Sequence, residues 1–215
     1  MDFNLLDIII VLILLASLII GYNKGFIGAV AGMVSTLAGL GIAFLFRNQA
    51  ADYLEEQYGL VTDLIIFLEK KLTASAGLGD QPGWVTSLPI IQNGLAALHR
   101  QIAEFAYLLV AAGCFLILYV LSSMLIGIIC LMLERILPRW VLGSINRPGG
   151  VVVILSQNIL IMAALAGILA SPLYAGAQLG FKVAAPLVAL MQASVLLPFL
   201  LQIFAGLQDL IKLWV

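Results

Sequence analysis

The sequence has little charge and an even balance of signs, and each shortage excludes a class of protein. Asp, Glu, Lys and Arg make up 10% of the 215 residues, against about 25% in an ordinary soluble domain. Ten basic residues face eleven acidic ones, so we expect no nucleic-acid partner, which would need a basic face. Hydrophobic residues make up 63% of the chain, more than a soluble fold of this length buries. We therefore predict an all-α integral membrane protein, with residues 1–215 forming a single membrane domain.

Cysteine and histidine are too scarce to indicate a catalytic or metal centre. Cys114 and Cys130 lie in one apolar run, and sixteen helical residues would separate them by roughly 24 Å, too far for a disulfide. His99 lies beside Arg100 on an amphipathic stretch and is interpreted as solvated or interfacial. The sequence has no G-x-S-x-G, phosphate-loop or H-E-x-x-H motif. We predict that the protein is not an enzyme and needs no cofactor or metal.

Four apolar segments are long enough to cross a bilayer, which takes about 20 residues of helix. We predict transmembrane helices at residues 5–22, 26–46, 105–133 and 151–174. The first is expected to be a retained helix, because acidic rather than basic residues precede its apolar run. A further apolar segment, 183–208, is interrupted by Pro186 and Pro198. It is compatible with a fifth span, a re-entrant pair or helices on the membrane surface.

Residues 47–104 are predicted to form an extramembrane insert of amphipathic, interfacial helices. They contain most of the acidic residues, and their apolar residues recur at helical spacing. The second of these amphipathic stretches has an apolar stripe that leads into the third span and could pack on a partner helix. It consists of Ile91, Leu95, Leu98, Ile102 and Phe105.

The basic residues of the short connections predict the orientation of the chain. Lys24 lies in the first connection, and Arg135, Arg139 and Arg147 lie in the third. With four spans these two connections share one side of the membrane, which the positive-inside rule makes cytoplasmic. The insert would then face the opposite side.

Two short passages contain the candidate functional residues at the predicted helix ends. Asp7, in the first turn of the first span, is either a proton or cation site or an interfacial residue stabilised by the helix N-terminus. Gly21, Lys24, Gly25 and Phe26 belong to the tight first connection. Asn146, Arg147 and Gly150 lead into the fourth span. The basic side chains of these passages either anchor the topology or bind lipid phosphate.

Small and polar residues inside the spans indicate contacts between helices. Gly28 and Gly32 form a GxxxG face that lets another helix approach closely. Gln157 and Asn158 are uncharged polar residues well inside the fourth span. They would either hydrogen-bond across helices or line a polar path.

Two passages together resemble the CvpA family, the colicin V production proteins of bacterial inner membranes. The first runs from Asp7 to Gly21-Tyr22-Asn23-Lys24-Gly25-Phe26, and the second is Ile145-Asn146-Arg147-Pro148-Gly149-Gly150. The chain departs from the family pattern at Gly28 and Ala29, where the family often has charged residues. It also departs at Ile154, Gln157 and Asn158, where the family often has Gly and then Arg/Lys-Gly.

The resemblance implies a multi-pass protein of the bacterial cytoplasmic membrane that supports toxin production, export or envelope maintenance. We expect it to act within the lipid bilayer by helix contacts with copies of itself or with another membrane protein. The alternative is an oligomeric channel or transporter for a small solute or ion, with Gln157 and Asn158 on its path.

Overall fold

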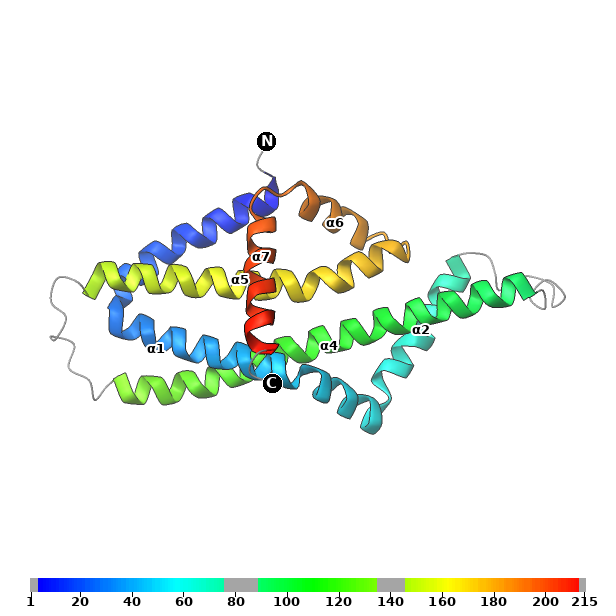
Figure 1. Ribbon diagram of the computed structural model, residues 1–215, viewed down its shortest axis with the longest axis horizontal. Coiled ribbons are helices and arrows are strands. Elements are labelled where there is room, and N and C mark those ends of the chain that lie inside the picture. The colour runs from blue at the N-terminus through cyan, green and yellow to red at the C-terminus, as the bar shows by residue number, and fades with distance from the viewer. Residues whose placement is uncertain (1–3, 76–88, 135–145, 213–215) are drawn as a thin grey trace.

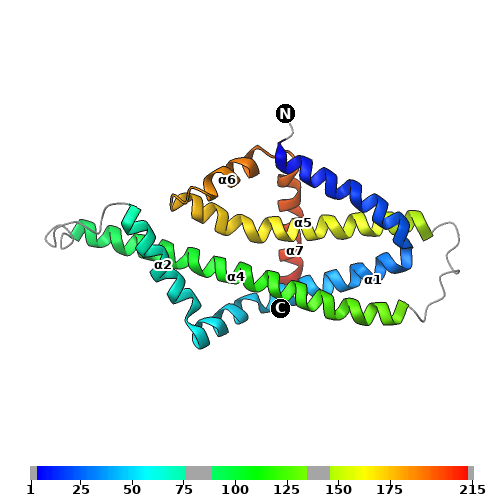
Figure 2. The ribbon, with the colours of Figure 1, turned by 180° about the vertical axis from the view of Figure 1, so that it is seen from behind.

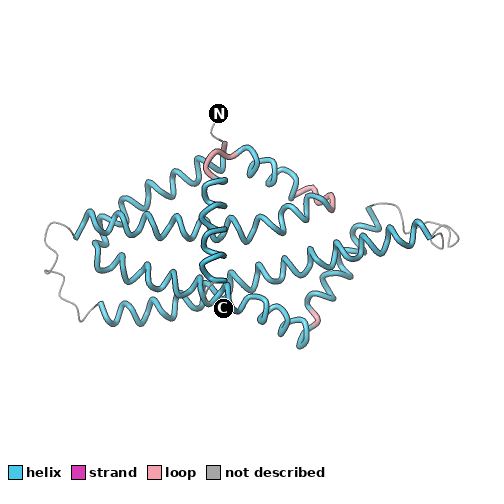
Figure 3. The backbone as a smooth tube through the Cα atoms, in the orientation of Figure 1, coloured by secondary structure: helices cyan, strands magenta, loops and turns pink. Residues whose placement is uncertain are grey.

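The computed structural model describes residues 4–75, 89–134 and 146–212, and every element in these ranges is a helix. The helices are α1 (Leu5–Tyr58), α2 (Leu60–Ser75), α4 (Pro89–Glu134), α5 (Asn146–Gln178), α6 (Ala184–Ala193) and α7 (Leu197–Lys212) (Figure 1). Short loops connect α5 to α6 and α6 to α7 (Figure 3). The predicted all-α class is confirmed.

Helix α1 contains the first two predicted spans and folds back on itself between them. Its backbone leaves the helical region at Gly25, with φ 74° and ψ 173°, a conformation that favours glycine. The two arms of α1 diverge from this point in both ribbon views (Figures 1 and 2). The break therefore lies inside the predicted connection between residues 22 and 26.

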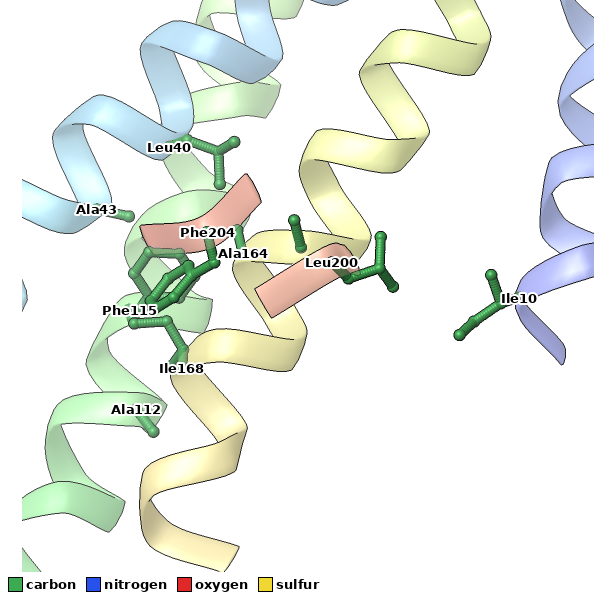
Figure 4. Close-up of a cluster of buried hydrophobic side chains, with 10 residues drawn as sticks. Ile10, Leu40, Ala43, Ala112, Phe115, Ala164, Ile168, Leu200 and Phe204 are labelled. Carbon is green, nitrogen blue, oxygen red and sulfur yellow. The ribbon is translucent and has the colours of Figure 1, made fainter. Parts of the chain in front are cut away.

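The bundle is formed by the two arms of α1 packed along α4 and α5. Helices α1, α4 and α5 each contain a segment long and apolar enough to cross a membrane. Phe115 of α4 is fully buried at the centre, against the Phe44 ring of α1 at 5.0 Å between centroids. Small residues such as Ala163 and Ala164 of α5 let the helices approach this core closely (Figure 4).

Helix α2 and the N-terminal half of α4 form an arm that projects beyond the bundle (Figures 1 and 2). The arm has a small apolar core of its own, in which Val61 and Leu68 of α2 meet Ile102 and Phe105 of α4. The second predicted stripe thus packs, from Leu98 onward, against α2. Its members Ile91 and Leu95 have side chains outside the described set.

The corner between α1 and α2 is fixed by a glycine and a glutamate. Gly59 ends α1 in the left-handed conformation, with φ 64°. The Glu55 carboxylate accepts hydrogen bonds from the Val61 N–H at 2.6 Å and the Thr62 hydroxyl at 2.5 Å. Glu55 lies beyond the apolar part of α1. The Thr62 hydroxyl, against some desolvation and with the Thr62 and Val61 N–H groups, holds the pKa of Glu55 below its ordinary value.

The C-terminal apolar segment forms two helices rather than one. Helices α6 and α7 are bent by 95° across the break at 194–196. Helix α7 then crosses α5 (Figure 1), where the Phe204 ring lies so close to Gly167 that a Cβ there would be 2.1 Å from it. The segment is therefore a bent pair, a form that fits a broken fifth span or a re-entrant pair.

Candidate functional site

The two motifs that carry the family resemblance meet at one end of the bundle. The Asn146 side chain accepts a hydrogen bond from the Phe26 N–H through Oδ1 at 2.8 Å. This bond satisfies a backbone donor that the turn at Gly25 leaves without a helical partner. A Cβ on Gly25 would lie 2.9 Å from the Asn146 Nδ2 atom. Asn146 thus fits directly over the glycine turn, although 120 residues separate it from Phe26.

Helices α1 and α5 touch backbone to backbone beside this turn. A Cβ on Gly150 would lie 2.4 Å from the carbonyl oxygen of Gly21. A Cβ on Gly21 would lie 2.6 Å from the Cα atom of Val151. Any larger residue at either position would force the helices apart, so these two glycines set the spacing between α1 and α5.

Basic side chains gather at the same end. The Arg147 Nη1 atom donates to the Tyr22 hydroxyl at 3.2 Å, and the guanidinium lies 5.2 Å from the centre of the Tyr22 ring. Lys24 lies two residues after Tyr22 in the chain, and the side chains of Lys24 and Arg147 are both exposed. Lys24 and Arg147 therefore share one end of the bundle. The predicted partners Arg135 and Arg139 lie outside the described residues.

Asp7 is fully buried, and its carboxylate binds the break between α6 and α7. The carboxylate accepts hydrogen bonds from the Ser194 hydroxyl at 2.6 Å, the Leu196 N–H at 3.0 Å and the Val195 N–H at 3.2 Å. These groups precede the first turn of α7, where backbone N–H groups lack helical partners and favour an anion. The carboxylate thus caps a helix from the far end of the chain.

Asn4 completes this junction, which the sequence did not indicate beyond Asp7 itself. The Asn4 side chain accepts from the Asp7 N–H at 3.0 Å, while the Asn4 N–H donates to the Asp7 carboxylate at 3.2 Å. The Asn4 Nδ2 atom also donates to the carbonyl of Leu190 in α6 at 2.6 Å. The capping box of α1 therefore also holds α6. Its sequence signal was an Asn three residues before an Asp.

Polar residues in the middle of the bundle join α5 to both arms of α1. The Asn158 Nδ2 atom donates to the Ser17 hydroxyl at 2.5 Å. The Gln157 Nε2 atom donates to the Thr36 hydroxyl at 2.9 Å. Among the described residues, the buried Gln157 Oε1 atom has no hydrogen-bond partner. Both side chains thus hydrogen-bond across helices, as one of the two sequence interpretations expected.

Gly28 and Gly32 face the chain's own helices. Gly28 is buried, and the Cβ position of Gly32 lies 3.2 Å from Gln157 Oε1 and 3.3 Å from Lys24 Nζ. The two glycines line a pocket of about 120 Å³ together with Gly127 of α4. In this chain the GxxxG face makes room between α1, α4 and α5.

The described residues contain no group of three or more His, Cys, Asp or Glu side chains placed to hold a metal ion. His99 lies on the arm, where its Nδ1 atom contacts the Glu69 carboxylate of α2. This pair joins α2 to α4 at an exposed position.

Apolar helices of this length, joined through small residues and internal hydrogen bonds, define an all-α multi-pass membrane protein. A family model described as Colicin V production protein matches residues 6–205. The chain belongs to this family, and the resemblance inferred from the two motifs is confirmed. No curated protein and no solved structure matches the chain.

Proposed function

We propose that the protein is a non-enzymatic scaffold of the bacterial cytoplasmic membrane that supports toxin production, export or envelope maintenance. It acts through helix contacts with copies of itself or with another membrane protein. The family match supports a link to colicin V production. The molecular role rests on what the polar groups inside the bundle do.

One observation carries this proposal: the polar groups of the spans are engaged in holding the helices together. The Asp7 carboxylate caps α7, Asn158 binds Ser17, and Gln157 binds Thr36. Ionisable and polar residues inside transport proteins typically face a pathway and bind its cargo. Here they bind neighbouring helices of the same chain, which favours a rigid structural element.

The arm of α2 and α4 is the surface that we propose for the partner. It projects from the bundle (Figure 1), and Ile66 of α2 exposes 58% of its surface there. Phe67 beside it exposes 59%, and neighbouring exposed apolar side chains are typical of a surface that contacts a partner or lipid. The partner would therefore contact α2 on its outer face.

The test is the mass and composition of the complex extracted from native membranes in mild detergent. We expect a fixed ratio with another protein or with further copies, and we expect Ile66→Asp to reduce it to the single chain. Tyr53→Asp is the matched control, because Tyr53 exposes 59% of its surface and belongs to α1. A wild-type protein extracted as a single chain would contradict the scaffold function.

An oligomeric channel is the second candidate, favoured by the unpartnered Gln157 oxygen. This atom and the Lys24 ammonium both lie within 3.3 Å of the Cβ position of Gly32, beside a pocket that is small and local. A path would need several copies of the chain. Solute or ion flux into proteoliposomes that Gln157→Leu abolishes would support a channel, whereas absence of flux would leave the scaffold.

A further inference from the structure

A partly buried arginine lies at the other end of the spans from Lys24 and Arg147. Arg47 follows the apolar segment of α1, and its guanidinium lies 5.7 Å from the centre of the Phe44 ring. Among the described residues, no carboxylate forms an ion pair with it. A charge withdrawn from water is costly, and such charges are normally paired. An anion from outside the chain would therefore supply the partner that Arg47 lacks among the described residues.

The guanidinium borders a pocket of about 110 Å³ between α1, α4, α5 and α7. One water molecule needs about 10–15 Å³ of such volume, so the pocket has room for a larger group. The lining contains no acidic side chain. Its polar side chains, which come from all four helices, are Arg47, Asn48, Tyr107, Ser171 and Gln208.

Each of these five side chains contains a hydrogen-bond donor, but the Tyr107 hydroxyl already donates to the Asp52 carboxylate at 3.2 Å. The donors for a ligand are therefore Arg47, Asn48, Ser171 and Gln208. A planar carboxylate is satisfied by one guanidinium fork, whereas a phosphate group offers oxygens in several directions. Donors from three different helices, α1, α5 and α7, therefore match a phosphate better. The rest of the wall is apolar and includes Ile168 and Phe204, which suits a phosphate attached to hydrocarbon.

We propose that this pocket binds a phosphate group, with Arg47 as its charge partner. The phosphate belongs either to a phospholipid headgroup or to free phosphate in solution. Arg47 directly follows the apolar segment of α1, and the polar headgroups of a bilayer lie at the ends of such segments. The guanidinium neutralises the phosphate, and the amide and hydroxyl donors orient it.

Arg147 provides the matched comparison within the same chain. It is also an arginine that lies over an aromatic ring at the end of an apolar segment, but it is exposed and already donates a hydrogen bond to the Tyr22 hydroxyl. An arginine of this kind anchors a helix at the interface without a dedicated site. Removing either charge changes the net charge equally, so only a built site distinguishes the two variants.

The experiment uses the full-length protein in a neutral detergent and phosphate-free buffer. Thermal unfolding is followed while dihexanoyl phosphatidic acid, dihexanoylglycerol or inorganic phosphate is added. A ligand that binds the folded state raises the melting temperature in a saturable way. We expect phosphatidic acid to do so and dihexanoylglycerol, which lacks the phosphate, to have no such effect. Arg47→Gln should weaken binding at least tenfold, and Arg147→Gln should leave it unchanged.

The two sources of phosphate are separated by competition. Inorganic phosphate that displaces phosphatidic acid at similar concentrations identifies a soluble anion, and its failure to compete identifies a lipid headgroup. Equal binding by wild type and Arg47→Gln would overturn the proposal, as would equal effects of the two lipids. Should Arg47→Gln fail to fold, Arg47→Lys and Gln208→Leu replace it. Both are expected to weaken binding, and unchanged binding in both would refute the site.

Discussion

Replacing Asp7 with asparagine is expected to release the C-terminal helix pair from the bundle. One carboxylate oxygen accepts from the Ser194 hydroxyl and the Leu196 N–H, and the other accepts from the Val195 N–H and the Asn4 N–H. Asparagine keeps one oxygen but places an NH₂ group where the other stood. That NH₂ group faces donors, so two backbone donors lose their acceptor in a buried site.

The magnitude follows from these lost bonds. A buried donor left without a partner costs about 1–3 kcal/mol, so two of them cost about 2–6 kcal/mol. The charge that stabilises the start of α7 is lost as well. The equilibrium between docked and undocked α6–α7 should therefore shift roughly 30-fold to about 20,000-fold toward the undocked state.

The assay is the labelling rate of a single cysteine placed at Met191, which is buried against α1 and α5. Cys114 and Cys130 are first replaced with alanine, and each is a free cysteine. Labelling should be slow in the Asp7 protein and much faster in Asp7→Asn. The effects of Asp7→Asn and Ser194→Ala should be less than additive, because one contact is lost in both.

An unchanged labelling rate in Asp7→Asn would refute this reasoning. It would mean that packing alone holds α7, chiefly the Phe204 ring against Gly167 and Phe44. A protein that loses all helical structure would instead show that Asp7 stabilises the whole bundle. Circular dichroism on the same samples separates the two outcomes.

Three further predictions concern the bundle and the arm. Gly150→Ala should lower the free energy of unfolding in detergent by at least about 1–3 kcal/mol, because its Cβ would lie 2.4 Å from the Gly21 carbonyl oxygen. The control is Gly113→Ala, because Gly113 has open space around it. Equal melting temperatures of the two variants would contradict the close approach of α1 and α5. Gln157→Leu should change the free energy of unfolding by less than about 1 kcal/mol. The variant loses one hydrogen bond, but it also removes a buried oxygen that has no partner among the described residues. A larger loss in thermal unfolding would mean that this oxygen has a partner. The pKa of Glu55 is lowered in the folded state, so the stability that its carboxylate gives to the start of α2 is complete above the ordinary glutamate pKa and is lost as pH falls through the folded-state pKa. Amide exchange at the start of α2 should therefore speed up in that pH range in the wild type. In Glu55→Gln, exchange at the same amides should show no pH dependence beyond that of intrinsic exchange.

Hydropathy and turn residues were sufficient to predict the helices and their main break. Runs of apolar residues indicate spans because the bilayer requires them, and the turn at Gly25 follows from a glycine between two such runs. Lys24 and Arg147 lie at one end, because helices that cross in alternate directions bring alternate connections together. These are local properties, or they follow from counting spans.

The prolines of the C-terminal segment show why its form stayed open. Pro186 and Pro198 seemed to interrupt one span, but they lie in the first turns of α6 and α7. A proline is tolerated there because the first N–H groups of a helix have no internal acceptor. The break falls between them, at residues 194–196. The same residue type thus marks a start here, and sequence alone does not distinguish this from an interruption.

The hydrogen-bond partners of Asp7 and the pocket at Arg47 could not be predicted from the sequence, for a different reason. The Asp7 carboxylate meets Ser194 across 187 residues, and the pocket needs four helices in register. Neither leaves a periodic signal in the sequence, because each depends on the assembled bundle. Gly21 and Gly150 are an intermediate case: the sequence predicts them as members of the two motifs, and the structure shows that they face each other.

The residues of the two family-like motifs hold the helices of this fold together, so variants at these positions report on stability. Asp7 fastens α6 and α7, Gly25 and Asn146 form the turn, and Gly21 and Gly150 set the spacing of α1 and α5. A variant at any of them is expected to loosen the bundle, so a loss of function in it would not identify a binding site. Informative variants must lie where the fold leaves groups unused. Arg47 and Ile66 meet that condition, because Arg47 forms no ion pair among the described residues and Ile66 exposes 58% of its surface.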